Sequence, residues 1–98
     1  MIVELSEAAQ RDLEAIADHI ATDNPRRALS FLLELRAKCL ELAIHPERFA
    51  LVPRYEHRGV RRSVHGRYLV FYRVETVRVV VLHVLPGAMD YEPILFPG

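Results

Sequence analysis

A hydroxyl, a phenol, an imidazole and a guanidinium are predicted to lie beside one another on a β-sheet. They belong to Ser63, Tyr68 and His83, in one row across three strands, with Arg61 next to the row. Such groups supply the proton donors, proton acceptors and positive charge that general acid–base cleavage of a phosphodiester needs. The row has no carboxylate to orient His83, and Ser63 is not adjacent to His83. A buried, hydrogen-bonded polar row is therefore the alternative interpretation.

The row depends on the register of three β-rich runs near the end of the chain. These runs cover residues 59–64, 67–75 and 77–85, and they are separated by His65-Gly66 and Glu75-Thr76. A two-residue connection that contains Gly is a strong hairpin signal, because Gly accepts a positive φ. Turns of this length pair Val64 with Arg67 and Val74 with Val77. The third run is apolar on both faces, so we expect it to be a central, covered strand.

A short strand and two helices precede these runs. Residues 2–5 form an apolar run, and residues 7–22 and 25–44 have helical periodicity. Ser6 and Asn24 are the predicted N-caps, and Pro25 at the first helical position needs no N–H partner. The resulting fold class is α+β, in which a strand and a helical hairpin precede a three-stranded antiparallel meander. Residues 45–58 are predicted to be a loop, and the apolar residues of the tail after 88 are expected to pack back.

The second helix is apolar over too wide an arc for a single sheet to cover. At 100° per residue its apolar side chains span roughly 200°, about twice what packing on one sheet requires. The surplus must meet the first helix or a partner. Arg36 lies inside this arc, where a guanidinium needs a carboxylate, an escape to water or a partner.

Length and composition exclude several classes of protein. A length of 98 residues fits one domain over residues 1–98. The 13 basic and 13 acidic side chains balance, and this argues against a protein that coats nucleic acid. The lone Cys39 excludes a disulfide framework and cysteine-rich zinc motifs, and the five histidines lack metal-ligand spacing. No phosphate-binding glycine loop, signal peptide or membrane span is present in the sequence. We therefore expect a cytoplasmic protein without metal, cofactor or direct membrane contact.

Charge is unevenly distributed along this neutral chain. Residues 1–24 hold six acids against Arg11, a balance of −5, and residues 54–73 hold six arginines against Glu56, a balance of +5. Either the two regions serve different partners, or they neutralise each other within the fold. In the second case Arg61 and Arg62 would pair with acids of the first helix, such as Asp12 or Asp18.

The ordered set of motifs resembles one toxin superfamily. The carrying segments are "NP" between the helices, "LAIHPE" at the end of the second helix, and "GVRRSVHGRYLVFYRV" through the first hairpin. Over about residues 2–90 the chain resembles the ParE/RelE superfamily of type II toxin–antitoxin systems, and it is more similar to ParE. The resemblance implies the toxin fold of that superfamily and a ParD-like antitoxin that neutralises the toxin in a hetero-oligomer.

The resemblance also implies a target. ParE-like toxins poison DNA gyrase without catalysis, whereas RelE-like toxins are ribosome-dependent mRNA interferases. This chain has Leu69, Pro86 and Met89 where RelE-like nucleases and many other members carry basic or histidine side chains. None of these three can act as acid, base or cation. We therefore expect a gyrase poison rather than an enzyme, with the interferase, or a non-toxic member that only binds antitoxin, as alternatives.

Two sets of side chains are the candidate contacts. The target-binding candidates are Arg58, Arg61, Arg62, Arg67, Tyr68 and His83, together with the tail from Tyr91 to Phe96. The antitoxin-binding candidates are Leu13, Ile16, Ile20, Phe31, Leu35 and Arg36. For the tail, packing as part of the core is the competing interpretation.

Overall fold

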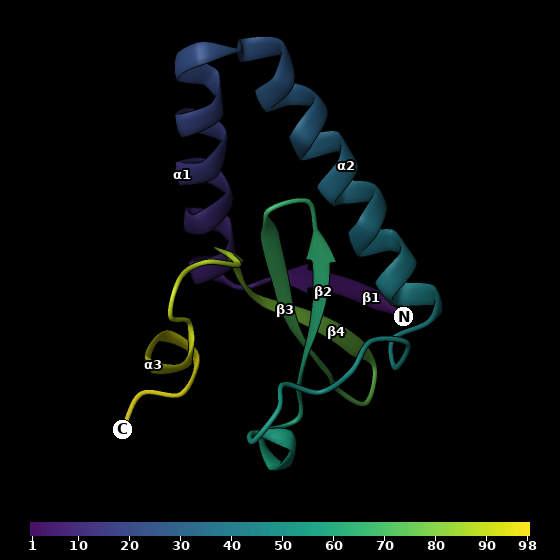
Figure 1. Cartoon of the computed structure of the whole chain (residues 1–98). Helices are drawn as coiled ribbons and strands as arrows, with labels where there is room; N and C mark the ends of the chain where they lie inside the picture. Colours follow the sequence, from purple (N-terminus) through teal and green to yellow (C-terminus); the bar gives the residue numbers. More distant parts are fainter.

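The computed structural model describes residues 1–98 and places two long helices on one face of a four-stranded sheet (Figure 1). The strands, in the spatial order β1-β4-β3-β2, are β1 (Ile2–Leu5), β2 (Val60–His65), β3 (Tyr68–Val74) and β4 (Arg78–Pro86). The helices are α1 (Glu7–Asp23), α2 (Pro25–Ile44) and the short α3 (Glu92–Leu95), with a 3-10 turn at Glu56–Arg58. This confirms the α+β prediction of a strand, a helical hairpin and an antiparallel meander.

Both long helices begin at the predicted caps. Ser6 Oγ accepts a hydrogen bond from the Ala9 N–H at 3.0 Å, and Asn24 Oδ1 accepts one from the Arg27 N–H at 3.1 Å. The Asn24 N–H also donates to the Ile20 carbonyl at the end of α1. One residue therefore ends the first helix and begins the second, and this forces a tight hairpin.

Strand β4 is central, as its two-sided apolar sequence predicts. It pairs with β1 in parallel and with β3 in antiparallel orientation. A bulge opposite Phe71 and Tyr72 leaves Leu82 unpaired, since Phe71 pairs with His83 and Tyr72 with Val81. The extra residue lets Val84 share the helix-side core with Val81 instead of turning to the opposite face.

The predicted hairpin registers, and the polar row that rests on them, are wrong. The first turn consists of Gly66 and Arg67, so that His65 pairs with Tyr68 and Ser63 pairs with Val70. The prediction placed Gly66 second in the turn, after His65. In the structure Gly66 is the first turn residue, and it has the positive φ, 59°. The second connection is also longer, with Val74 opposite Val79. Ser63, Tyr68 and His83 therefore do not form a row.

The sheet has an apolar core on each face. Under the helices, the main members are Ala9, Ile16, Phe31, Leu35, Leu42, Val70, Tyr72, Val79, Val81 and Val84. On the other face, the core comprises Val52, Val60, Phe71, Leu85 and Phe96. The tail supplies Phe96, which is only 8% exposed, so the expectation that the tail packs back is confirmed.

Candidate functional site

An apolar groove lies between the two helices and β1. It has a volume of about 410 Å³, and seven of its eight lining side chains are hydrophobic. The hydrophobic residues are Val3, Leu5, Leu13, Leu32, Leu35, Cys39 and Leu40. The eighth is Arg36, which is exposed and makes no ion pair. A groove of this kind offers apolar contact area together with one free positive charge at its rim.

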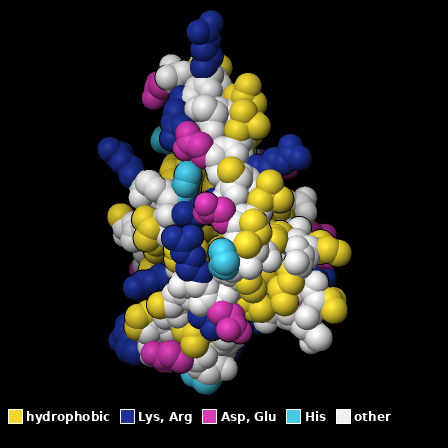
Figure 2. Space-filling view, turned by 90° about the vertical axis from the view of Figure 1, so that its right-hand side faces the viewer, with side chains coloured by type: hydrophobic (Ala, Val, Ile, Leu, Met, Phe, Trp, Pro, Cys, Tyr) yellow, Lys and Arg dark blue, Asp and Glu magenta, His cyan; other side chains and the backbone are white.

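The apolar surface continues from the groove onto the outer side of α2. Leu29, Leu33, Leu40 and Ile44 are 57–70% exposed, and their spacing places them on one stripe of the helix. Figure 2 looks onto the α2 side of the molecule and shows hydrophobic side chains running down this face. A contiguous apolar surface of this kind marks an interaction site in soluble proteins.

Only part of the predicted antitoxin-binding set lies in the groove. Leu13, Leu35 and Arg36 line it, although Leu35 is only 3% exposed. Ile16 and Phe31 are 7% and 2% exposed and belong to the core without lining the groove. Ile20 packs partly buried against the same core. The periodicity of α2 gave the signal for the missed residues, because Leu29, Leu32 and Leu40 belong to its surplus apolar arc. Leu33 and Ile44, as well as Val3 and Leu5 of β1, needed the structure.

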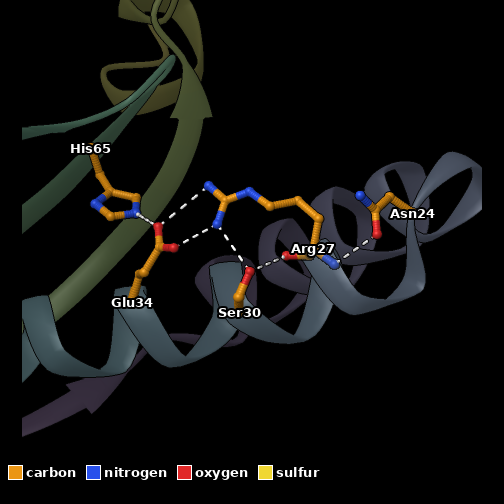
Figure 3. Close-up of polar contacts among 5 residues, drawn as sticks. All are labelled: Asn24, Arg27, Ser30, Glu34 and His65. Atoms are coloured by element: carbon orange, nitrogen blue, oxygen red, sulfur yellow. Dashed lines mark hydrogen bonds and ion pairs between the residues drawn. The ribbon is translucent and has the colours of Figure 1, made fainter.

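A polar network joins α2 to the tip of the β2–β3 hairpin (Figure 3). Glu34 lies between the Arg27 guanidinium, which donates to both carboxylate oxygens, and His65, whose Nε2 is 3.1 Å from Oε1. Ser30 Oγ accepts a further hydrogen bond from Arg27 at 3.1 Å. The hydrogen bond from Arg27 lowers the pKa of Glu34 and is also the main cause of a raised pKa of Arg27. Lys38 donates to the Val64 carbonyl at 2.8 Å and so adds a second tie between α2 and the hairpin.

The basic candidates for target binding are mostly engaged within the fold. Arg61 donates to the carbonyls of Glu47 and Phe49, and Arg62 donates to the Tyr91 hydroxyl at 2.6 Å. The alternative in which these two arginines pair with acids of the first helix is therefore wrong, because Arg61 and Arg62 bind the loop and the tail.

The other target-binding candidates differ in whether their side chains make contacts within the fold. Arg58 lies over the Phe96 ring, 5.2 Å from its centroid. Arg67 is exposed at the hairpin turn and makes no ion pair. Tyr68 packs edge-on against Phe31 with ring centroids 5.2 Å apart. Arg67 is thus the arginine of the set whose side chain has no ion pair, hydrogen bond or aromatic contact within the fold.

His83 has a carboxylate partner that the sequence did not reveal. Asp12 Oδ2 lies 2.8 Å from His83 Nδ1 and accepts a hydrogen bond from the Val84 N–H at 2.9 Å. Asp12 is 71 positions away in the sequence and reaches β4 from α1, so no local spacing could have signalled the pair. The expectation that no carboxylate orients His83 is wrong.

Two of the three side chains that the family resemblance singled out, Leu69 and Pro86, have structural roles in the fold. Leu69 packs against the apolar core on the tail side of the sheet, and Pro86 ends β4. Met89 is 43% exposed in the segment after that strand. No group of three or more His, Cys, Asp or Glu side chains is placed to hold a metal ion. None of the helices combines the length and the apolar character that crossing a membrane requires.

Comparisons with known proteins agree on the family and the fold. Residues 3–91 match the model of the ParE toxin of the type II toxin–antitoxin system parDE. No curated protein matches the sequence.

Two solved structures share the fold. A chain of the chromosomal ParDE system of P. aeruginosa aligns with a TM-score of 0.75 and 24% identity, covering 88% of this chain and 95% of that one. A chain of the RelBE2 toxin–antitoxin complex of Mycobacterium tuberculosis aligns with a TM-score of 0.61 and 26% identity, covering 87% of this chain and 95% of that one.

Proposed function

This chain belongs to the ParE toxin family of type II toxin–antitoxin systems, and on that premise we propose that it poisons DNA gyrase and is neutralised by a ParD-like antitoxin. The observation that carries the antitoxin half of the proposal is the uncovered apolar groove with Arg36 at its rim. The support for the gyrase half is the family together with the lack of acids, bases or cations at Leu69, Pro86 and Met89.

The groove fits an amphipathic segment of the antitoxin. A segment that folds on binding would bury its apolar face against Leu32 and Leu40 and the outer stripe of α2. An acidic side chain of the segment would pair with Arg36, which has no partner in the fold. The complex formed in this way is a hetero-oligomer, and the covered surface explains why the free toxin leaves so much apolar area on one helix.

Replacing one groove residue tests this half of the proposal. Leu40 is 59% exposed, so Leu40→Asp should leave the fold intact while it places an unpaired charge in the bound interface. We expect the affinity for the cognate antitoxin, measured by calorimetry, to fall by about 100-fold or more. Val77→Asp is the matched control, because Val77 is 73% exposed in the β3–β4 turn and does not line the groove. Wild-type affinity in Leu40→Asp would exclude the groove as the antitoxin site.

The hairpin tip is our candidate for the gyrase contact. Arg67 is exposed there and unpaired, whereas Arg61 and Arg62 are held by the loop and the tail. Arg67→Ala should therefore reduce toxicity without reducing antitoxin binding. Arg26→Ala on α2, also exposed and without an ion pair, is the control. Full toxicity of Arg67→Ala would remove the hairpin tip from the target interface.

Two observations favour the mRNA interferase as a second candidate. The chain is similar to a chain of the RelBE2 complex, and the Asp12–His83 pair has the carboxylate–imidazole arrangement that general acid–base catalysis uses. Expression without antitoxin separates the two functions. Double-strand breaks and an SOS response support the gyrase poison, and codon-phased mRNA cuts support the interferase. Unchanged growth would contradict both and leave a member that only binds antitoxin.

A further inference from the structure

A second hollow, separate from the groove, lies beside the docked tail. It has a volume of about 300 Å³ between the first turn of α1, the strands and the tail. Three of its lining side chains are nitrogen-bearing, Arg58, Arg73 and His83, and no carboxylate is among the lining residues. Ile94 to Phe96 form an apolar wall on the tail side.

The orientation of His83 in this hollow is fixed from behind. Asp12 Oδ2 is 2.8 Å from Nδ1 and is itself held by the Val84 N–H at 2.9 Å. The carboxylate on Nδ1 fixes the orientation of the ring, so that Nε2 faces away from Asp12. The imidazole is 21% exposed, so a ligand in the hollow can reach it.

The positive charge of the hollow comes mainly from Arg58. This guanidinium has no carboxylate partner and is held over the Phe96 ring, 5.2 Å from its centroid. Arg73 pairs with Glu75 at 3.0 Å, and Arg78, which shares Glu75, also pairs with Glu4. The hollow therefore presents one unneutralised guanidinium, that of Arg58, and a second that is paired with a carboxylate outside the lining.

We propose that this hollow binds the phosphate group of a phosphate ester, with the organic part of the ester against Ile94 to Phe96. The Arg58 guanidinium has the planar set of donors that matches phosphate oxygens, and charge-assisted hydrogen bonds to an oxyanion are strong. In its imidazolium form the His83 ring donates from Nε2 to a phosphate oxygen, and Asp12 acts as the positioning residue of the ring. The phosphate can belong to a free nucleotide or to a nucleic-acid backbone. The inference goes beyond toxicity and uses neither the groove residues nor Arg67, so its failure leaves the proposed antitoxin and gyrase contacts untouched.

Titration of the full chain with three probes tests the proposal. Inorganic phosphate, a nucleoside 5′-monophosphate and a dinucleotide are added at constant ionic strength while the ¹H–¹⁵N signals of Arg58 Nε and the His83 ring are followed by NMR. We expect saturable shifts with the nucleotide or the dinucleotide, and weaker binding of inorganic phosphate, which has no organic part. Tighter binding of the mononucleotide assigns a free nucleotide as ligand, and tighter binding of the dinucleotide assigns a nucleic-acid backbone.

Variants separate a built site from general attraction to positive charge. Arg58→Gln should weaken binding about tenfold, the equivalent of one charge-assisted contact. Asp12→Asn should weaken binding less and should move the His83 signals even without ligand. Arg26→Gln, at an exposed arginine in the first turn of α2 that does not line the hollow, should have no effect. The proposal is overturned if chloride produces the same shifts, if no probe saturates, or if Arg58→Gln and Arg26→Gln bind alike.

Discussion

The two faces of the sheet are covered in different ways. On one face, α1 and α2 bury Val79, Val81 and Tyr72, yet they leave an apolar groove and an exposed leucine stripe. On the other face, the loop before β2 and the tail bury Phe71 and Leu85. Polar groups then fasten that cover, as when Arg62 donates to the Tyr91 hydroxyl.

This difference separates a face whose apolar surface needs a partner from a face whose apolar core the chain covers itself. The chain's own residues cover the core of the tail face up to the hollow beside the tail, and Arg54 fastens this cover by binding Glu92 at 2.8 Å. The helical face is unfinished, and the charge at its rim, Arg36, has no partner. Changes on the tail face should therefore lower the stability of the free protein, and changes on the helical face should lower its affinity for the antitoxin.

The largest expected effect is the loss of an aromatic side chain from the tail. Phe96 is 8% exposed and stacks on Tyr55 with ring centroids 4.0 Å apart. Phe96→Ala should lower the free energy of unfolding by about 3 kcal/mol, measured by urea denaturation, because it leaves a cavity in the core of that face. Ile94→Ala, at a residue 41% exposed, is the control and should cost under about 1 kcal/mol.

Deletion of residues 91–98 extends this comparison to toxicity. If the tail is core, the deletion should destabilise the protein, and toxicity should be lost along with the fold. A truncated protein that keeps its stability and antitoxin binding but loses toxicity would instead make the tail a target contact. That result would show that the tail face also contacts a partner, as the helical face is proposed to do.

The second prediction concerns the charge of Arg36 at the rim of the groove on the helical face. Arg36 is exposed and unpaired, so Arg36→Glu should leave the melting temperature of the free protein unchanged. In the complex it should lower antitoxin affinity about tenfold, and the loss should shrink at high salt because screening weakens the interaction. Arg26→Glu controls for the change in net charge. Equal losses in the two variants would show that Arg36 has no specific acidic partner.

The sequence predicts the elements of this fold well because their signals are local. The caps at Ser6 and Asn24, the helical periodicity and the two-sided apolar pattern of β4 each depend on residues within a few positions of one another. The surplus apolar arc of α2 likewise predicted a contact with the first helix or with a partner, and part of this arc lines the groove.

The sequence could not predict the pairing of residues across the fold. The register depended on whether Gly66 stands first or second in its turn, and the bulge at Leu82 has no sequence marker. The Asp12–His83 contact depends on how α1 crosses the end of β4. Which arginines make contacts within the fold depends on where the loop before β2 and the C-terminal tail pack against the sheet.

A third, smaller effect isolates one fastening of the tail. The Tyr91 hydroxyl accepts a hydrogen bond from Arg62 at 2.6 Å, whereas the Tyr55 hydroxyl is 3.4 Å from Glu92. Tyr91→Phe should therefore lower the free energy of unfolding by about 1 to 2 kcal/mol, and Tyr55→Phe by under about 0.5 kcal/mol. Urea denaturation of both variants provides the measurement. A larger loss in Tyr55→Phe would reverse the assignment of which contact holds the tail.

Lowering the pH tests the polar network that joins α2 to the tip of the β2–β3 hairpin. The hydrogen bond from Arg27 lowers the pKa of Glu34 from its ordinary value of 4.5, so the folded state favours the ionised carboxylate. The stability from this contact is complete above pH 4.5 and is lost as the pH falls through the lowered folded pKa. Glu34→Gln should therefore show a smaller drop in melting temperature than the wild type between pH 6 and about pH 3. Because the pair is exposed, the difference should be small, and identical pH profiles would show that the network contributes nothing.

The last prediction concerns the reactivity of Cys39, which tests the helical face without changing the fold. Burial raises the pKa of this thiol, against a smaller opposing influence of Lys38, so less reactive thiolate is present at a given pH. Alkylation by iodoacetamide at pH 8 should therefore be slower in the folded protein than in the urea-unfolded chain, and it should accelerate as the pH rises. Cys39 lines the groove, so saturating antitoxin should slow the reaction further. Leu40→Asp, which binds antitoxin poorly, should lose this protection at the same antitoxin concentration, whereas Val77→Asp should keep it. Equal alkylation rates with and without antitoxin would mean that the partner covers some other surface, and that the groove is not what distinguishes the helical face.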